Sequence, residues 1–413
     1  MEEWKEYKLG EIAQIQTGPF GSQLHQSDYV DNGVPCIMPT NIGKNLDIIS
    51  DGIVHISEND AQRLSRHLVT VGDIIYARRG DIEKCAYIQE LQNGWFCGTG
   101  CLRIRINKDV DSHFIAYQLS TSEAKSWIVG NAVGTTMLNL NSSILNDLPI
   151  LLPSISTQRH ITAILKSLDD KIEVNRRIND NLEQQAQALF KSWFVDFEPF
   201  RNQPFTETEL GMIPEGWRVG TLNDFGEIVG GSTPSKAKPE YYTDNGIAWL
   251  TPKDLSVSKC KFTSRGEIDI TQEGYDSCST KLMPKGTVLF SSRAPIGYIT
   301  IAKNDICTNQ GFKSVIPKLA GTAFIYCFLK ESTQEIENKA TGSTFKEASG
   351  SLMKSLPAIV PEKVILDDFE DLMKPIYKQQ EVLEDENSRL SSLRDTLLPR
   401  LMSGEIKVED VTL

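Results

Sequence analysis

The sequence predicts a tandem, pseudo-twofold repeat of two mixed α/β (α+β) units, joined by two long helices that form an antiparallel coiled coil. The first observation is a repeat, in which Trp4 recurs 213 residues later as Trp217 and Asp31-Asn32-Gly33 recurs as Asp244-Asn245-Gly246. The second is that each copy has a mixed region punctuated by glycines, followed by a heptad pattern. A period of about 200 residues is too long for a solenoid, so we expect two copies of one folded unit that hold two similar ligands.

The repeat divides the chain into five segments, and prolines at 199, 204 and 214 mark the stretch between the two copies. We expect a first mixed unit at 1–153, a central helix at 154–197, a linker at 198–214, a second mixed unit at 215–361, and a distal helix with its tail at 362–413.

Short β-like runs follow turn signals in both mixed units, at Asp73–Ala77 and Thr287–Ser291. The run Cys101–Ile106 alternates, with apolar residues on one face and Arg103 and Arg105 on the other. This pattern predicts a half-buried strand with a basic outer face, which makes both arginines candidate ligand contacts. The alternative is an exposed strand face that binds nothing.

Two predicted helices keep a 3.5-residue period over more than four heptads, which is typical of a coiled coil. Pro375 is expected to kink or delay the second helix. In an antiparallel pseudo-twofold pair, Asn175 would face Asn387, and a buried asparagine pair would set the register. The alternative places both asparagines on a solvated edge. The core positions are Ile161, Leu165, Leu168, Ile172, Asn175, Asn179, Leu182, Ala186, Leu189 and Trp193, and then Phe369, Met373, Ile376, Gln380, Leu383, Asn387, Leu390, Arg394, Leu397 and Leu401.

The composition is that of an ordinary globular protein, with 413 residues, 40% hydrophobic and 24% charged. The apolar runs are far shorter than the roughly 20 residues of a membrane span, and the N-terminus is not a secretory signal, so we expect a cytoplasmic protein without a membrane partner. The eight cysteines are scattered without paired C-x-x-C spacing, and the five histidines do not cluster near them. We therefore expect reduced thiols and no metal site.

The net charge of −12 argues against a nucleic-acid partner when it is taken alone. The charge is uneven, however, because residues 215–360 carry 17 basic and 15 acidic side chains while the remaining segments are acidic. Within this segment, basic residues crowd one stretch at Lys236, Lys238, Lys253, Lys259, Lys261 and Arg265. Such a cluster is either a solvated face or a surface that contacts phosphates.

Several short motifs together resemble the specificity subunits of type I restriction–modification systems (the HsdS family), and the resemblance covers nearly the whole chain. Pro214-Glu-Gly-Trp217 opens the second unit, and Trp4 followed by Leu9-Gly-Glu-Ile12 opens the first in similar style. Leu-Pro pairs at 148–149 and 356–357 lead into the helices, and Leu401-Met-Ser-Gly-Glu-Ile406 closes the second.

The resemblance implies two target-recognition domains that each read one half of a bipartite site on double-stranded DNA, with the two helices as the spacer. It also implies that the chain is not an enzyme, takes no cofactor, and recruits two methyltransferase (modification) subunits, which motor-nuclease (restriction) subunits join. The residues agree that catalytic motifs are missing, since the chain has no phosphate loop, no Asn/Asp-Pro-Pro-Tyr/Phe tetrapeptide and no His-Glu-x-x-His pair. The alternatives are a methyltransferase or nuclease with duplicated domains, or a structural scaffold that does not bind DNA.

Residues at matched positions in both units have the chemistry to contact bases or phosphates. The Arg78-Arg79-Gly80 corner matches Ser292-Arg293-Ala294. Instead of contacting DNA, its two arginines could pair with Asp73 or Asp81. The Gly-Thr-Thr and Gly-Ser-Thr turns that begin at residues 134 and 342 would alternatively cap the helical segments that follow them. The candidate DNA contacts are Ser22, Arg78, Arg79, Arg103, Arg105, Thr135, Thr136, Lys236, Lys253, Lys259, Lys261, Arg293, Lys313, Ser343, Thr344 and Lys346.

Overall fold

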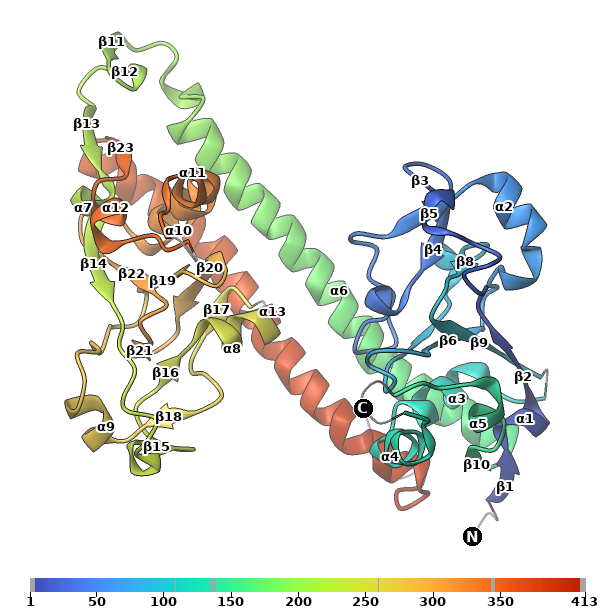
Figure 1. The fold of residues 1–413 in the computed structure, drawn as a ribbon. Helices are drawn as coiled ribbons and strands as arrows, with labels where there is room; N and C mark the ends of the chain where they lie inside the picture. The colour runs from blue at the N-terminus through green and yellow to red at the C-terminus, as the bar shows by residue number, and fades with distance from the viewer. Residues whose placement is uncertain (1–3, 108, 135–137, 259, 343–345, 409–413) are drawn as a thin grey trace. The chain divides into compact units, whose positions relative to one another are not determined.

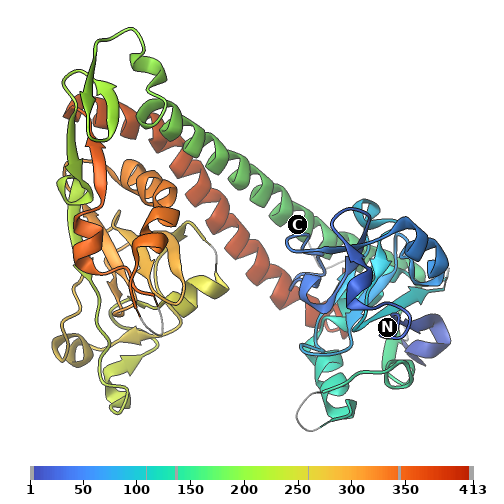
Figure 2. The ribbon, with the colours of Figure 1, turned by 45° about the horizontal axis from the view of Figure 1, so that its top comes forward.

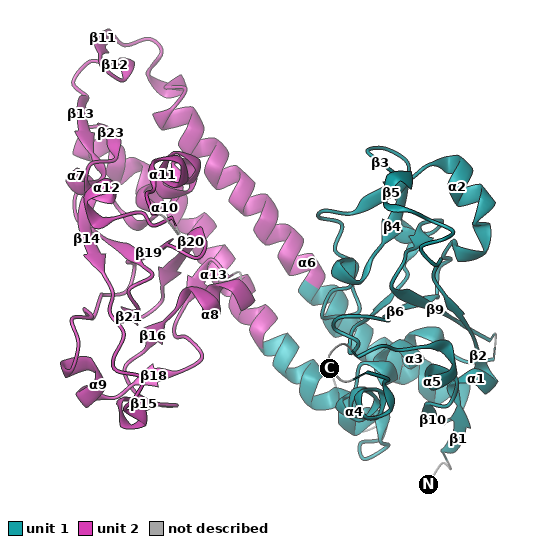
Figure 3. Ribbon diagram, in the orientation of Figure 1, with its two compact units in different colours: residues 1–172, 389–413 teal, residues 173–388 magenta. Residues whose placement is uncertain are grey.

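The computed structural model describes residues 4–107, 109–134, 138–258, 260–342 and 346–408. The chain forms two compact units, shown in Figure 3: unit 1 contains residues 1–172 and 389–413, and unit 2 contains residues 173–388. Two helices of 40 residues, α6 (Ile155–Phe194) and α13 (Lys363–Met402), each contribute one part to unit 1 and the other to unit 2. Pro375 does not delay α13, which begins at Lys363.

The main sheet of unit 1 has the strand order β2-β9-β6-β7, with all neighbours antiparallel. A second sheet has the order β3-β5-β4-β8, in which β4 and β8 run parallel. A separate antiparallel pair, β1 with β10, joins the start of the unit to the strand before α6. The strands are β1 (Lys5–Lys8), β2 (Ala13–Thr17), β3 (Tyr29–Val30), β4 (Val34–Ile37), β5 (Val54–Ile56), β6 (Ile74–Ala77), β7 (Cys85–Tyr87), β8 (Phe96–Cys97), β9 (Cys101–Ile106) and β10 (Pro149–Leu152).

Helices cover the main sheet of unit 1, and the longer ones begin at side chains that cap them. Asp111 and Thr121 accept hydrogen bonds from the backbone of α3 and α4, which satisfies amides that a helix leaves free at its start. The core combines Phe114 and Leu119 of α3 with Tyr76 of β6 and with Leu401 of α13. The helices are α1 (Leu9–Ile12), α2 (Glu58–Arg63), α3 (Ser112–Leu119), α4 (Ser122–Asn131) and α5 (Ser142–Asn146), with 3₁₀ turns η1 (Gln26–Asp28), η2 (Pro39–Asn41), η3 (Ser65–His67) and η4 (Glu90–Gln92).

Unit 2 repeats this pairing pattern. Its main sheet, β14-β22-β19-β20-β17, matches the order of unit 1 and adds β17 at one edge. The pair β13–β23 corresponds to β1–β10, and the parallel pair β16–β21 corresponds to β4–β8. The predicted tandem repeat is therefore confirmed for the four matching strands of the main sheet and for these two strand pairs. The strands are β13 (Arg218–Thr221), β14 (Gly226–Gly230), β15 (Tyr242–Thr243), β16 (Trp249–Leu250), β17 (Phe262–Thr263), β18 (Asp269–Ile270), β19 (Val288–Ser292), β20 (Ile296–Ala302), β21 (Cys307–Thr308), β22 (Lys313–Pro317) and β23 (Pro357–Val360).

In unit 2, α10 and α11 pack on β20 and α12 packs on β14, as Figures 1 and 2 show. The stretch predicted as a linker contains an ordered hairpin, β11 with β12, that follows the turn η5. Phe200 packs edge-on against Trp217 at 5.0 Å between ring centroids, and Ile213 shares the same core cluster, while most residues between them are exposed. The elements are η5 (Glu198–Phe200), β11 (Phe205–Thr208), β12 (Gly211–Pro214), α7 (Leu222–Phe225), η6 (Pro239–Tyr241), α8 (Pro252–Val257), α9 (Gln272–Asp276), α10 (Thr322–Glu331), α11 (Thr333–Lys339) and α12 (Gly350–Lys354).

Within each unit, its part of α6 packs antiparallel on its part of α13. In unit 1, Asp169 Oδ1 accepts a hydrogen bond of 2.8 Å from Arg394 Nη1, and Ile161 shares a core cluster with Leu401. In unit 2, the rings of Trp193 and Phe369 lie 5.7 Å apart. Residues later in α6 therefore contact residues earlier in α13. This is the antiparallel pairing that the heptad pattern predicts.

The asparagines of the two heptad series meet inside unit 2. Asn175 Nδ2 donates to Asn387 Oδ1 at 2.9 Å and to Glu386 Oε2 at 2.7 Å. Asn175 is fully buried, so the alternative that places it on a solvated edge does not hold. If the two helices shifted in register, the buried Asn175 amide would lose these acceptors. The pair therefore favours the observed register over shifted ones.

We expect an engineered disulfide to report this contact in solution. The double variant Asn175→Cys with Asn387→Cys should crosslink under mild oxidation, because the two side chains already touch. The control pair Ile172→Cys with Leu390→Cys lies one turn away on the same two helices and should also crosslink. Non-reducing electrophoresis after proteolysis between the helices measures both. Crosslinking of the control alone would show that the asparagines do not face each other.

Candidate functional site

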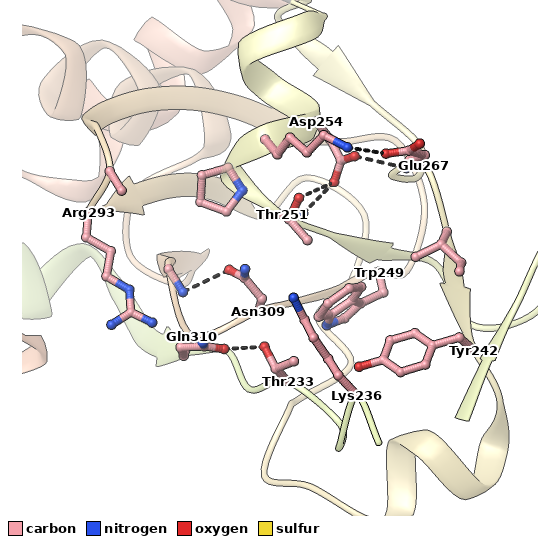
Figure 4. A pocket seen from close by; sticks show the side chains of 15 residues that line it. Thr233, Lys236, Tyr242, Trp249, Thr251, Asp254, Glu267, Arg293, Asn309 and Gln310 are labelled. Carbon is pink, nitrogen blue, oxygen red and sulfur yellow. Dashed lines mark hydrogen bonds and ion pairs between the residues drawn. The ribbon is translucent and has the colours of Figure 1, made fainter. Parts of the chain in front are cut away.

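A cavity of about 620 Å³ opens on unit 2 between several loops, shown in Figure 4. The parallel strands β16 and β21 end at this place, and the loops that follow them supply Thr251 and Asn309. The loop after β14 supplies Thr233 and Lys236, and the corner after β19 supplies Arg293. Residues far apart in sequence therefore converge on one concave surface, as polar groups do in many binding sites.

The glycine-rich loop at 230–235 is held against β21 by backbone contacts that require a glycine. A Cβ atom on Gly231 would lie 2.1 Å from the carbonyl oxygen of Asn309 and 2.2 Å from that of Thr308, so a larger residue would displace the loop. Two aromatic side chains also fix this loop: Trp249 Nε1 donates to Ser232 O at 3.2 Å, and Tyr242 Oη donates to Pro234 O at 2.7 Å. The rings of these two residues thus form one wall of the cavity.

Two neighbouring amide side chains stand at the end of β21 with their oxygens already engaged. Asn309 Oδ1 accepts a hydrogen bond of 2.8 Å from the backbone amide of Gly311. Gln310 Oε1 accepts a hydrogen bond from the Thr233 hydroxyl. Among the described residues, nothing accepts a hydrogen bond from Asn309 Nδ2 or Gln310 Nε2.

Charges of both signs line the cavity, and each carboxylate already accepts at least one hydrogen bond. Asp254 caps α8 by accepting from the backbone of Thr251 at 2.7 Å and also from the Glu267 amide at 3.0 Å. Glu267 pairs with Lys253 at 2.9 Å, and both of these side chains are 73% exposed. Lys236 is exposed and has no ion-pair partner among the described residues.

Arg293 and Lys313 share one carboxylate at the edge of this region. Glu347 lies 3.4 Å from Arg293 Nη1 and 3.2 Å from Lys313 Nζ. One carboxylate cannot saturate the eight N–H donors of an arginine and a lysine, so Arg293, which lines the cavity, keeps donors for a ligand.

The matching corner of unit 1 has a different surface. Arg78 occupies the place of Ser292, since its backbone amide donates to Gly100 O at 2.8 Å as that of Ser292 donates to Gly311 O at 2.7 Å. The Arg78 guanidinium lies 5.5 Å from the ring centre of Phe20, a ring that is 56% exposed. Burial lowers the pKa of Arg78, and its neighbour Arg79 adds to this effect.

The Arg78 guanidinium makes a cation–π contact with the Phe20 ring. Its Nε is buried and has no hydrogen-bond partner in the described part of the chain. Arg79 and Ser22 are exposed beside it, on the corner and on the glycine-rich loop. The predicted alternative for the two arginines is wrong, because Asp73 pairs with Arg105 and Asp81 pairs with Lys84.

The prediction of a basic outer face on β9 is wrong for Arg103. Its side chain is only 4% exposed, and its guanidinium donates to the carbonyls of Arg66 at 2.7 Å and Leu68 at 3.0 Å. The turn η3 covers this face of the strand, which the alternation within β9 alone could not reveal. Arg105 is partly exposed but is bound to Asp73 through contacts of 2.7 and 2.6 Å.

The prediction that Lys261 contacts phosphate from the surface is also wrong. Its side chain is 6% exposed, and its Nζ donates to Glu183 Oε2 at 2.7 Å and to Gln380 Oε1 at 2.8 Å. The ammonium lies 3.5 Å from the ring centre of Tyr377. It therefore joins the edge of the sheet in unit 2 to the parts of α6 and α13 that belong to the same unit.

The remaining predicted contacts fall into two groups. Lys346 is exposed and its Nζ donates to the carbonyl of Glu337 at 3.4 Å. Thr135, Thr136, Lys259, Ser343 and Thr344 lie outside the described residues. The predicted capping role of the turns at 134 and 342 belongs instead to Asn141 and Ser349, which cap α5 and α12.

Sequence reasoning missed Asn309, Gln310, Trp249 and Tyr242, which carry much of the chemistry of the cavity. A signal was available in the motif Asn309-Gln310-Gly311, since asparagine and glycine directly after a short strand favour a turn. Neither the spacing nor the composition of the chain could show which loops meet that turn.

The described part of the chain holds no cluster of three or more histidine, cysteine or acidic side chains arranged to bind a metal ion. In the same described residues, no helix is both long and apolar enough to cross a bilayer. All eight cysteines are free thiols.

Comparison with known proteins shows one family. The sequence profile described as the type I restriction modification DNA specificity domain matches residues 1–184 and again residues 214–384. The two matches coincide with the two halves of the repeat.

Individual relatives agree with this result. The chain is 43% identical over 190 residues to the type I restriction enzyme MjaIX specificity subunit of Methanocaldococcus jannaschii, a match that covers 44% of each chain. It is 26% identical over 474 residues to the HindI specificity subunit of Haemophilus influenzae, which covers 98% of this chain and 100% of the relative. The S subunit of a type I restriction–modification system from M. genitalium has a similar fold, with a TM-score of 0.57, 18% identity, and coverage of 97% of this chain and 96% of the other.

Proposed function

Because this chain belongs to the family of type I restriction–modification specificity subunits, we propose that it reads a bipartite target on double-stranded DNA, one half with each unit. The single observation that carries this proposal is the duplication itself, since both halves match the same DNA specificity domain. Two copies of one reading surface in one chain suit a target with two parts. The candidate surfaces are the cavity of unit 2 and the Arg78 corner of unit 1.

We further propose that the chain acts in the cytoplasm as a scaffold for two methyltransferase subunits and for motor-nuclease restriction subunits. The relatives named above are specificity subunits of restriction enzymes, which suggests partners that supply the chemistry. In this proposal the chain itself neither cuts nor methylates DNA. The helices α6 and α13 act as the spacer that sets the distance between the two half-sites.

Exchanging residues 1–150 for the same region of another family member is expected to change one half of the methylated target and leave the other half intact. The reason is that the exchanged segment contains the mixed part of unit 1 only, whereas the cavity lies wholly in unit 2. Methylome sequencing of a host that expresses the chimera with its methyltransferase partner measures both halves. A change in both half-sites would show that the units do not read independently.

An activity assay separates this proposal from its two alternatives. The purified chain, incubated with DNA, magnesium, ATP and S-adenosylmethionine, should leave the DNA unchanged, whereas a duplicated methyltransferase or nuclease would turn over. A gel shift with the partner methyltransferase should show sequence-dependent binding, whereas a scaffold without a DNA role would show none. Deleting the gene should remove one bipartite motif from the methylome of the host.

A further inference from the structure

Four side chains that line the unit 2 cavity have N–H donors available to a ligand. Asn309 Nδ2, Gln310 Nε2, Lys236 and Arg293 all line it with N–H groups, and among the described residues none of these four is fully satisfied. The two carboxylates that line it, Asp254 and Glu267, already accept hydrogen bonds. A ligand that contacts these four side chains must present acceptors to them.

The orientation of the Asn309 amide is determined by its neighbour. The backbone amide of Gly311 can only donate, so the atom of Asn309 that lies 2.8 Å from it is the oxygen. The free end of the side chain is therefore the NH₂ group. Asparagine usually reads adenine with both ends of its amide, accepting from N6 and donating to N7. Here the oxygen is already engaged, which disfavours that contact.

From this donor surface we propose that unit 2 reads a guanine in its half of the target, with Asn309 Nδ2 as the donor to N7. Guanine is the base that presents two adjacent acceptors in the major groove, whereas adenine places an N6 donor beside N7 and cytosine presents a donor. The N6 group of adenine would face the donors of Asn309, Lys236 and Arg293. This inference rests on the proposed function and adds the identity of one base to it.

A phosphate would also offer acceptors, but the surroundings favour a base. The side chains of Asp254 and Glu267 line the same cavity and offset two of its three cationic side chains, Lys236, Lys253 and Arg293, which weakens its attraction for an anionic ligand. The Tyr242 ring and the edge of the largely buried Trp249, which is 4% exposed, also line the cavity, and this apolar surface suits a base better than a hydrated phosphate. Lys236 and Arg293 then supply the neighbouring donors.

The substitution Asn309→Asp tests the proposal with little change of shape. The aspartate keeps an oxygen for the Gly311 amide and replaces the free NH₂ donor with an acceptor. Asn309→Ser is a second variant that keeps an oxygen near Gly311, removes the NH₂ group and adds no charge. The matched control is Asn304→Asp, the same change on an exposed residue of unit 2 that does not line the cavity.

The first measurement is the methylome of a host that expresses each variant with its methyltransferase partner. In Asn309→Asp and Asn309→Ser, one G·C pair in the half-site assigned to unit 2 by the chimera should lose its base preference. The control should keep the wild-type motif. An unchanged motif in both Asn309 variants would overturn the inference.

The second measurement is binding of the wild-type complex to a duplex that carries the methylome motif, with 7-deazaguanine in place of the implicated guanine. Loss of N7 should weaken binding about tenfold, and the Asn309→Ser complex should be insensitive to the same change. Uniform weakening of Asn309→Ser on all sequences, with a smaller salt dependence, would identify a phosphate contact and overturn the proposal. A host methylome that lacks any motif dependent on this gene would instead contradict the proposed function.

Discussion

Replacing Lys261 with methionine is expected to lower the free energy of unfolding of unit 2 by roughly 3 kcal/mol, near the lower end for breaking a buried ion pair. Methionine fills a similar volume but leaves the half-buried Glu183 carboxylate, 19% exposed, with Lys330 as its remaining cation. It also removes the hydrogen bond to Gln380 and the cation that lies 3.5 Å from the ring centre of Tyr377. Chemical denaturation monitored by tryptophan fluorescence measures the change.

The control for this prediction is Lys253→Met, the same substitution eight residues earlier in the sequence. Lys253 pairs with Glu267 on an exposed surface, where solvent screens the interaction, so its loss should leave stability almost unchanged. The double variant Lys261→Met with Glu183→Gln should recover most of the loss, because no charge is then buried without its partner. Equal effects of Lys261→Met and Lys253→Met would mean that the Lys261 site is not buried in solution.

Glu183 also makes the stability of this site depend on pH. Burial alone would raise the pKa of Glu183, but Lys261 and Lys330 together lower it to about 2. Burial lowers the pKa of Lys261, and the negative charge of Glu183 opposes that shift. A depressed carboxyl pKa stabilises the fold above its ordinary value of 4.5, and that stabilisation is lost as the pH falls from 4.5 toward 2. The stability difference between wild type and Glu183→Gln should narrow over this interval.

Inserting one heptad into both long helices is expected to lengthen the gap between the two half-sites by about three base pairs. Both helices cross between the units, and natural junctions for the insertions lie after Ile172 in α6 and after Ser388 in α13. Seven residues add about 10 Å at 1.5 Å per residue, while DNA rises 3.4 Å per base pair. A full heptad also preserves the apolar seam. Methylome sequencing should show the same half-sites at a wider spacing.

An insertion outside the helices provides the control for this experiment. Seven residues placed between Glu209 and Leu210, in the turn of the hairpin β11–β12, change the chain length without lengthening either helix. This variant should keep the original gap. An unchanged gap after the helix insertions would exclude the helices as the spacer, and a new half-site sequence would show that the insertion disturbs a unit.

Much of the fold could be predicted because it is encoded locally or by repetition. The strand Cys101–Ile106 was predicted with its observed bounds, since alternation is a property of the segment itself. The heptads placed Asn175 opposite Asn387, and the two side chains lie 2.9 Å apart. A helical period determines which face of each helix is apolar, and a twofold repeat then leaves few ways to pair the two faces.

The candidate site could be predicted only in part, because charge on a segment does not reveal what covers it. Arg103 and Lys261 were both predicted to be exposed and are both buried, the first under η3 and the second against α6 and α13. Asp73 was considered as a partner for Arg78 or Arg79 and binds Arg105 across the sheet. The groups that bind Arg103, Lys261 and Arg105 all lie more than 30 residues away from them in the sequence.

The sequence by itself therefore determined the two copies, the order of their elements and the antiparallel pairing of the long helices, because periodicity and duplication are visible along one dimension. Only the tertiary structure decided which basic residues face solvent and that the free end of Asn309 is a donor. The orientation of that amide depends on the Gly311 backbone beside it, and the cavity depends on four loops that meet around β16 and β21. Burial and hydrogen-bond direction are set by neighbours that only folding brings together.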